Sequence, residues 1–335
     1  MSSFNLRYCS IILSFLFVFQ AIAQNNNDKP GDKFTVEFVR SFSTNEDVVK
    51  DKSIGEKIVD WLFGEDVIQL VKPMKVIKDS WNRLLVLDQG AGYIVRIDTL
   101  EEEFQIVMNG NGKTFPSLVD ICEMKRGVYL FTDSKENMVY MYNEKDDIIS
   151  PFIKNKSLNQ PTGIAYNILT KEVWVVETLS HQISIFDMSG KFKKVVGSRG
   201  TEPGQFNFPT YIWIDKNGIV YVIDSMNFRL QILSPTGEII NTFGEPGDAT
   251  GYFARPKGVA VDSYGHIFIV DGLYNAIQAY NKDGEFLYYF GGKGSGNGKF
   301  WLPTGIFIDD EDYIYVADSF NSRIQIFKLL KKDEK

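Results

Sequence analysis

The chain has 335 residues, a net charge of -7 and a pI near 5.1, and 44% of its residues are hydrophobic. A nucleic-acid partner needs a basic surface that neutralises phosphates, so this charge balance disfavours a DNA- or RNA-binding function. The same acidity disfavours attachment to anionic lipid. The length and apolar content suit one large globular domain with a sizeable core.

The first residues have the pattern of an export signal. Arg7 is the only charged residue before an apolar run over residues 11–19, and Ala-Ile-Ala follows at residues 21–23 as a small-residue cleavage motif. We therefore expect residues 1–23 to be a cleaved signal peptide. The mature chain would then be exported to the periplasm, the outer cell surface or the medium. An uncleaved anchor is the alternative, although the run is short for a membrane-spanning helix.

Cleavage after Ala23 would leave Cys122 as the only cysteine of the chain. No intramolecular disulfide could then form, even in an oxidising compartment, so the hydrophobic core must supply the stability. Residues 24–33 are polar and predict a flexible mature N-terminus, and residues 331–335 predict a short charged tail.

A repeat with a period of 43 to 48 residues runs through the rest of the chain. A proline opens an apolar run in each copy: Pro73, Pro116, Pro161, Pro209, Pro256 and Pro303. A carboxylate closes the next apolar run: Asp88, Asp133, Glu177, Asp224, Asp271 and Asp318. Short β-branched and aromatic runs between turn residues are typical of strands, and four antiparallel strands per copy are typical of a propeller blade. The repeat predicts an all-β fold, a six-bladed β-propeller over residues 34–330, with blades starting near these prolines.

The last copy stops after its third strand, and residues 34–43 predict a strand with no blade of its own. We expect this N-terminal strand to join the last blade and close the ring, because closure removes an exposed sheet edge. Residues 53–63 combine a capping-box pattern with one apolar helical face and predict a short helix before the first blade. Two positions stay open for this helix: over a blade edge, or over the central tunnel mouth as a lid.

Three segments in the later copies resemble NHL repeats. They are PKGVAVD at residues 256–262, IYVAD at residues 314–318 and NSRIQIF at residues 321–327. The resemblance covers about residues 71–327 and is weakest in the first two copies, which lack the glycine after the opening proline. NHL-repeat propellers share a fold and differ in function, so the resemblance implies the architecture of an exported bacterial six-bladed propeller more firmly than an activity.

The candidate binding surface is the face of the ring that carries the long connections between blades, which we call the long-loop face. Its connections are residues 109–115, 154–160, 198–208, 245–255 and 292–302. Binding residues concentrate on long loops held by a rigid scaffold, and aromatic and basic side chains suit a protein, peptide or glycan partner. The predicted partner-binding residues are Arg199, Phe208, Tyr252, Arg255, Tyr274, Trp301, Phe228 and His181. Three other aromatic residues are expected to wedge neighbouring blades together: Phe206, Phe253 and Phe300.

Signatures of catalysis are mostly absent. The two histidines, His181 and His266, are predicted on opposite faces, which excludes a three-histidine zinc site. The repeated carboxylates are expected to tie loop amides to strand ends, with Arg229 and Arg323 as ion-pair partners. The acidic residues 309–312 could hold calcium weakly, but they lack the spacing of an EF-hand loop, so a solvated turn is expected. We therefore predict no catalytic residue, no metal site and no cofactor.

The sequence favours an exported, monomeric binding or scaffolding module that engages a protein, peptide or glycan through the long-loop face. The alternative is a lyase or hydrolase with a metal or carboxylate site at the central tunnel mouth.

Overall fold

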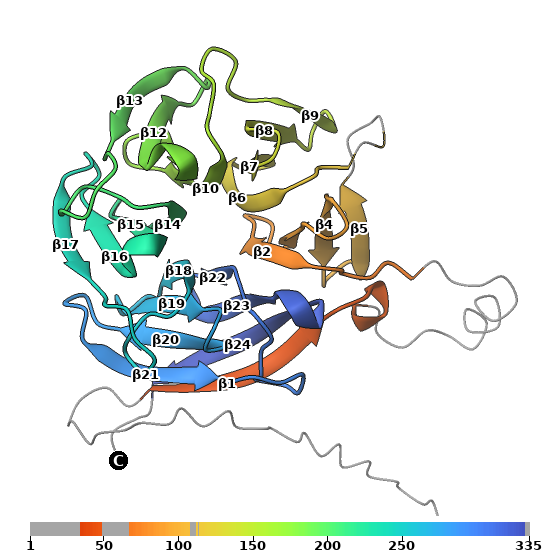
Figure 1. Cartoon of the computed structure of the whole chain (residues 1–335). Coiled ribbons are helices and arrows are strands. Elements are labelled where there is room, and N and C mark those ends of the chain that lie inside the picture. The colour runs from red at the N-terminus through yellow and green to blue at the C-terminus, as the bar shows by residue number, and fades with distance from the viewer. Residues whose placement is uncertain (1–33, 49–66, 108–111, 113, 332–335) are drawn as a thin grey trace, which may run out of the picture.

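The computed structural model describes residues 34–48, 67–107, 112 and 114–331. In this part of the chain, six four-stranded antiparallel sheets surround a central axis (Figure 1). The prediction of an all-β, six-bladed propeller is therefore confirmed. The predicted signal peptide, the mature N-terminus at residues 24–33 and the helix at residues 53–63 lie outside the described residues. No helix among the described residues has the length and apolar character needed to cross a bilayer.

Five blades are each built from four consecutive strands, which follow one another from the axis outwards. Blade 1 contains β2 (Pro73–Lys78), β3 (Leu84–Asp88), β4 (Tyr93–Asp98) and β5 (Glu103–Val107). Blade 2 contains β6 (Leu118–Lys125), β7 (Val128–Asp133), β8 (Met138–Asn143) and β9 (Ile148–Pro151). Blade 3 contains β10 (Pro161–Asn167), β11 (Glu172–Glu177), β12 (Gln182–Asp187) and β13 (Phe192–Val196). Blade 4 contains β14 (Pro209–Ile214), β15 (Val220–Asp224), β16 (Arg229–Leu233) and β17 (Ile239–Phe243). Blade 5 contains β18 (Pro256–Val261), β19 (Ile267–Asp271), β20 (Ala276–Tyr280) and β21 (Phe286–Gly291).

Blade 6 joins the two ends of the described chain. Its strands are β22 (Ile306–Ile308), β23 (Tyr313–Asp318), β24 (Arg323–Lys331) and, on the outside, β1 (Phe34–Phe42). The register of β1 on β24 runs antiparallel from Phe34 opposite Lys331 to Phe42 opposite Ile324. This is the pairing expected for residues 34–43, and Figure 1 shows the red β1 beside the blue β24.

The core consists of apolar layers between neighbouring blades. Each layer takes side chains from two adjacent sheets, as in the cluster that joins blades 6 and 1. Every residue of the second strand is buried in each of the first five blades. A second strand is covered on both faces by neighbouring blades, which explains its continuous apolar sequence in place of an alternating one. The wedge role predicted for Phe206, Phe253 and Phe300 is confirmed, because each side chain is fully buried in an apolar cluster shared by two neighbouring blades.

In blades 3, 5 and 6 a glycine stands two residues after the opening proline, where the close approach of the next blade leaves no room for a side chain. A Cβ atom on Gly258 would lie 2.7 Å from the carbonyl oxygen of Thr304, and one on Gly305 would lie 2.4 Å from that of Met74. Both distances are shorter than any normal contact, so a side chain would push adjacent inner strands apart. The Pro-x-Gly pattern therefore encodes contact between blades as well as a strand start.

Two inner strands start later than their prolines. In blade 6 the inner strand begins at Ile306, three residues after Pro303. Thr304 N already donates a hydrogen bond to the oxygen of Ala317 at 3.0 Å, but the regular pairing of the two strands starts only at Ile306. In blade 2, Leu118 pairs with Asp133 as Pro73 pairs with Asp88. The connection into blade 2 thus extends two residues beyond Pro116 before the strand begins.

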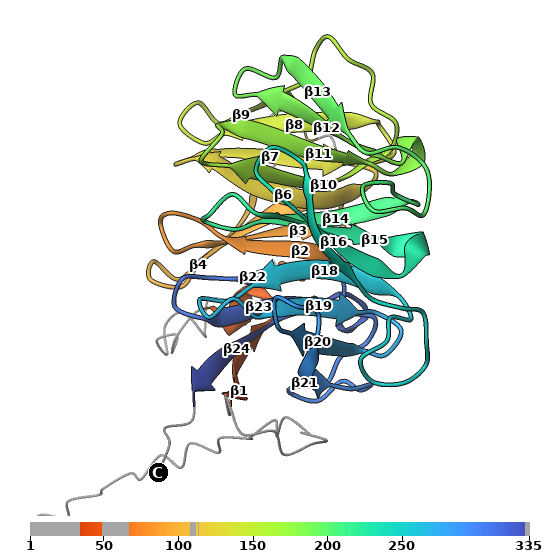
Figure 2. The same cartoon turned by 90° about the vertical axis from the view of Figure 1, so that its left-hand side faces the viewer.

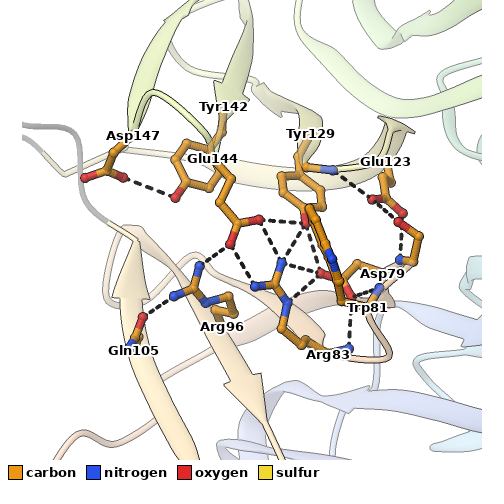
Figure 3. Close-up of polar contacts among 12 residues, drawn as sticks. Asp79, Trp81, Arg83, Arg96, Gln105, Glu123, Tyr129, Tyr142, Glu144 and Asp147 are labelled. Atoms are coloured by element: carbon orange, nitrogen blue, oxygen red, sulfur yellow. Dashed lines mark hydrogen bonds and ion pairs between the residues drawn. The ribbon is translucent and has the colours of Figure 1, made fainter. Parts of the chain in front are cut away.

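An ion-pair network joins blades 1 and 2 on the face opposite the long loops (Figure 3). Arg83 Nη2 contacts Asp79 Oδ2 at 2.8 Å and Glu144 Oε2 at 2.7 Å. Tyr129 donates its hydroxyl hydrogen to Asp79 at 2.9 Å, and Arg96 Nη1 contacts Glu144 at 2.5 Å. The hydrogen bond from Arg83 is the main reason why the pKa of Glu144 is lowered, although burial opposes it. The ionised carboxylate therefore stabilises the junction.

The buried end of the closing strand should be essential for stability. Phe42 is fully buried between blades 6 and 1, so Phe42→Ala should lower the free energy of unfolding by about 3–5 kcal/mol. Val39 is 45% exposed on the same strand, and Val39→Ala should change it by less than about 0.5 kcal/mol. Urea unfolding followed by tryptophan fluorescence measures both. Equal stability of the two variants would contradict the closing role of β1.

The blade 1–2 network should make stability depend on pH. The folded pKa of Glu144 lies below its ordinary 4.5, so its stabilisation is complete above pH 4.5 and is lost as the pH falls through the folded pKa. Glu144→Gln should lower the free energy of unfolding by about 1–2 kcal/mol at neutral pH. The difference in Tm between this variant and the parent should shrink as the pH falls below 4.5. The exposed Glu101→Gln serves as control and should show no such convergence. A difference in Tm that stays constant with pH would rule out this role.

Candidate functional site: the long-loop face

The turn between the second and third strands of several blades is a short 3-10 helix on the long-loop face. These turns are η2 (Thr178–Ser180), η3 (Ser225–Asn227) and η4 (Ser319–Asn321), and Figure 2 shows them at one end of the ring, with the long connections. A left-handed residue ends each turn: His181, Phe228 and Ser322 have φ values of 54°, 52° and 53°. The long-loop face is thus built from turns of fixed shape beside longer loops.

Buried carboxylates hold the long connections against the blades. The Oδ atoms of Asp224, Asp271 and Asp318 accept hydrogen bonds from the backbone N–H groups of Asn207 at 2.6 Å, Ala254 at 2.8 Å and Trp301 at 2.8 Å. These carboxylates are fully buried. The predicted structural role of the repeated carboxylates is therefore confirmed for these blades.

The two predicted arginine partners extend this arrangement. Arg229 Nε contacts Asp224 at 2.8 Å, and Arg323 Nε contacts Asp318 at 2.7 Å, so both predicted ion pairs are confirmed. The terminal nitrogens of the same two guanidinium groups donate to backbone carbonyls of the long connections. Arg229 Nη2 donates to the oxygen of Gln205, and Arg323 Nη2 donates to that of Lys299, at 2.9 Å each. Each carboxylate and its arginine therefore fix a loop whose other side faces solvent.

Carboxylates engaged in this way are poor metal ligands. Across the described ranges, no group of three or more His, Cys, Asp or Glu side chains is placed to hold a metal ion. In the acidic segment at residues 309–312, Asp309 contacts Lys78 at 2.8 Å, and Asp312 accepts a hydrogen bond from the hydroxyl of Ser263 at 2.7 Å. The segment thus forms contacts between blades as well as a turn.

His181 is buried at a contact between blades. Its Nδ1 accepts a hydrogen bond from Phe208 N at 3.1 Å, and the two rings lie 4.5 Å apart. Asn275 holds the same position in blade 5 and accepts from Leu302 N at 2.8 Å. Burial and, second, the charge of Arg199 lower the pKa of His181, which keeps the imidazole neutral. The sequence correctly predicted that His181 lies on the long-loop face, but its Nδ1 accepts a hydrogen bond from the connection to the neighbouring blade and is not free for a ligand.

The other predicted site residues differ in exposure. Trp301 is 47% exposed and Tyr252 is 41% exposed, and the side chains of Arg199 and Arg255 are also exposed. Phe208, Phe228 and Tyr274 are half-buried, and the hydroxyl of Tyr274 donates to the oxygen of Gly247 at 2.5 Å. The face therefore presents two aromatic and two basic side chains of the predicted set to solvent.

Two residues outside the predicted set extend the site at blades 6 and 1. The ring of Phe320 lies 5.8 Å from that of Trp301, and Lys72 Nζ lies 5.7 Å from the Phe320 ring. Lys72 precedes Pro73 as Arg255 precedes Pro256, so the repeat spacing was the signal that could have identified it.

Another residue outside the predicted set, Lys257, lies near the start of inner strand β18. Its side chain is half-buried, and burial, followed by repulsion from Arg255 and Lys72, lowers its pKa to about 8. No described carboxylate forms an ion pair with Lys257 or Arg255. The centre of the long-loop face is therefore cationic in a chain with a net charge of -7.

A cavity of about 180 Å³ lies in the central tunnel, along the inner strands of blades 1 to 4 and 6. Lys75 and Cys122 line it together with aromatic residues that include Trp213 and Phe307. Lys75 is buried, with Nζ 3.5 Å from the carboxylate of Asp120 and 3.1 Å from the oxygen of Ile306. Burial raises the pKa of Asp120 and of the Cys122 thiol. A protonated thiol is a poor nucleophile, so Cys122 does not suit covalent catalysis.

The cationic centre can be tested through the titration of Lys257. After reductive methylation with ¹³C-formaldehyde, its NMR signal, assigned with Lys257→Arg, should titrate with a midpoint near 8 in place of the ordinary 10.5. Arg255→Gln should raise that midpoint, because it removes a positive charge that disfavours protonation. A midpoint near 10.5 for Lys257 would contradict its burial beside Arg255 and Lys72 at the centre of the long-loop face.

A family model described as "6-bladed beta-propeller" matches residues 158–242 and 254–333, which include nearly all of blades 3, 4 and 5 and three of the four strands of blade 6. No curated protein matches the sequence.

Solved structures of other propellers superimpose on this chain. An auxiliary nutrient binding protein from Bacteroides thetaiotaomicron has a TM-score of 0.63 at 14% identity, with 89% of this chain and 77% of that chain covered. A putative phosphatase from the same organism has a TM-score of 0.64 at 14% identity, with coverage of 90% and 80%. Virginiamycin B lyase from Staphylococcus aureus has a TM-score of 0.58 at 15% identity, with coverage of 89% and 100%. At such identities the likeness concerns the fold, and the chain is a six-bladed β-propeller.

Proposed function

We propose that this protein is an exported, monomeric binding module that engages a protein, peptide or glycan partner through its long-loop face. The observation that carries the proposal is that Trp301 and Tyr252 are exposed on the long-loop face, which also carries Arg255 and Lys257, two cations with no ion-pair partner among the described carboxylates. Export is inferred from the pattern of residues 1–23. The structural neighbours described as nutrient-binding proteins support a binding role.

Rigid presentation of these side chains also favours binding. The N–H of Trp301 is fixed by Asp318, and the oxygen of Tyr252 accepts a hydrogen bond from Gln278 at 2.9 Å. Loops held in this way lose little conformational entropy when a partner docks. Tryptophan, tyrosine and arginine are also the residues most enriched where binding energy concentrates.

A lyase or hydrolase is the second candidate, and the tunnel cavity with its buried charged pair favours it. However, the charged groups of this pair are already engaged. Lys75, which lines the cavity, contacts Asp120 and Ile306, and Asp120 accepts hydrogen bonds from the backbone N–H groups of Ile121 at 3.0 Å and Ile164 at 3.1 Å. A general base needs a free lone pair that faces the substrate. We therefore prefer the binding function.

Removal of the exposed aromatic pair should abolish partner capture. Trp301→Ala combined with Tyr252→Ala should weaken capture from a native envelope fraction by more than about tenfold, because each is an exposed anchor on a fixed loop. The Tm should stay close to that of the parent. The matched control is Tyr264→Ala, 50% exposed on the opposite face, which should leave capture intact. Undiminished capture by the double variant would contradict the proposed face.

A further inference from the structure

Four exposed apolar side chains occupy the same position in four successive blades. Each lies two residues after the buried carboxylate of its blade, and the spacing between them is 47 residues. They are Leu179, Met226, Leu273 and Phe320, with exposures of 48%, 54%, 59% and 48%. We call them the apolar arc. Blades 1 and 2 carry Gly90 and Lys135 at this position, so the arc covers blades 3 to 6 only.

The fold itself does not require apolar side chains at these positions. The backbone N–H groups of Leu273 and Lys135 donate alike to the preceding carboxylates, at 3.1 Å to Asp271 and 3.0 Å to Asp133. A lysine at this position therefore forms the same backbone hydrogen bond as a leucine does. Single exposed apolar side chains are common on proteins. Their recurrence at one position of one face in four successive blades, where the fold does not require them, is what indicates an interaction surface.

The cations lie closer to the axis than the arc. Arg255 and Lys257 flank the first residue of the innermost strand of blade 5, whereas the arc residues stand on turns between second and third strands. Arg199 adds an exposed charge on the connection before blade 4. The carboxylate of Asp271, two residues before Leu273, is buried and engaged by loop amides, whereas Asp248 on the connection before blade 5 is exposed. The surface is thus apolar at its periphery and positive at its centre.

We propose that the apolar arc and the cations inside it form one docking surface for an acidic polypeptide segment. Apolar side chains of the segment would pack on Leu273, Phe320 and their equivalents, and a carboxylate would project to Arg255 and Lys257. This assignment rests on the binding function proposed above and specifies the chemistry of the partner.

Charge and shape distinguish a polypeptide from the other anionic or apolar partners. A glycan offers little apolar surface to four separate side chains. A flat anionic membrane would meet a protein with a net charge of -7, and its headgroups would not reach the half-buried Lys257. A polypeptide supplies several apolar groups along its length and a carboxylate that can enter the mouth.

The probe is a random dodecapeptide library selected on the parent protein, with enriched peptides synthesised and their Kd measured by fluorescence polarisation. Enriched sequences should combine Asp or Glu with Leu, Ile, Phe or Trp. Replacement of all four arc residues by serine should weaken their binding by more than about tenfold. Arg255→Gln with Lys257→Gln should do the same. The matched control replaces Leu100, Ile168 and Leu169, exposed apolar residues on opposite-face turns, by serine and should leave the Kd unchanged.

Several results would overturn the inference. Selection of basic or purely polar peptides, absence of enrichment, or an unchanged Kd for the arc variant would each do so. Binding to phosphatidylglycerol vesicles without peptide enrichment would assign the surface to a membrane, and a dimer that the arc variant loses in light scattering would assign it to a second copy. If the four-serine variant does not fold, Leu273→Ser and Phe320→Ser alone should each weaken binding measurably.

The same variants separate this inference from the proposed function. A glycan or peptide whose binding is lost in the Trp301/Tyr252 variant but kept in the arc variant overturns the inference and leaves the binding function standing. A ligand that binds all of these variants equally overturns both.

Discussion

The hydrogen bond between a buried carboxylate and the backbone of a long connection is the constraint on which the candidate site depends. In blades 4 to 6, an aspartate at the end of the second strand fixes the loop that enters its own blade. A buried carboxylate costs free energy unless it is hydrogen-bonded. Moving one of these loops away would leave its carboxylate buried without that bond, so the position of the loop depends on the folded core. Burial of these carboxylates also removes negative charge from the surface. The long-loop face is therefore positive at its centre although the chain as a whole is acidic.

Much of the fold was predictable from the sequence because its period is carried by residues with separate physical tasks. Proline starts an inner strand, and the carboxylate ends the next one, so two independent markers gave the same count of blades. The starts of the inner strands in blades 2 and 6 were less predictable. At Pro116 and Pro303 the proline is displaced from the ladder by two or three residues, and only the pairing partner shows where the strand begins.

The sequence predicted on which face of the ring the candidate residues lie, but not the exposure and contacts of their individual side chains. Sequence composition identified Trp301 and Arg255 as loop residues, and both are exposed. It could not show that His181 turns toward the neighbouring blade, because the direction follows from a left-handed residue in the turn. It also missed Lys257, whose position inside a strand suggested no surface role. The apolar arc follows the repeat, yet an apolar residue at a regular spacing is ordinarily assigned to the core.

The arrangement of blade 6 has a consequence for biosynthesis. Because a ribosome makes the chain from its N-terminus, β1 is produced before every strand of the five intervening blades, and its partner β24 is produced last. Until then Val36 and Phe42, which end up fully buried, have no sheet to join. The nascent protein therefore exposes an unpaired apolar strand throughout translation. Holding that segment apart from other chains is a task for chaperones in whichever compartment the ring assembles.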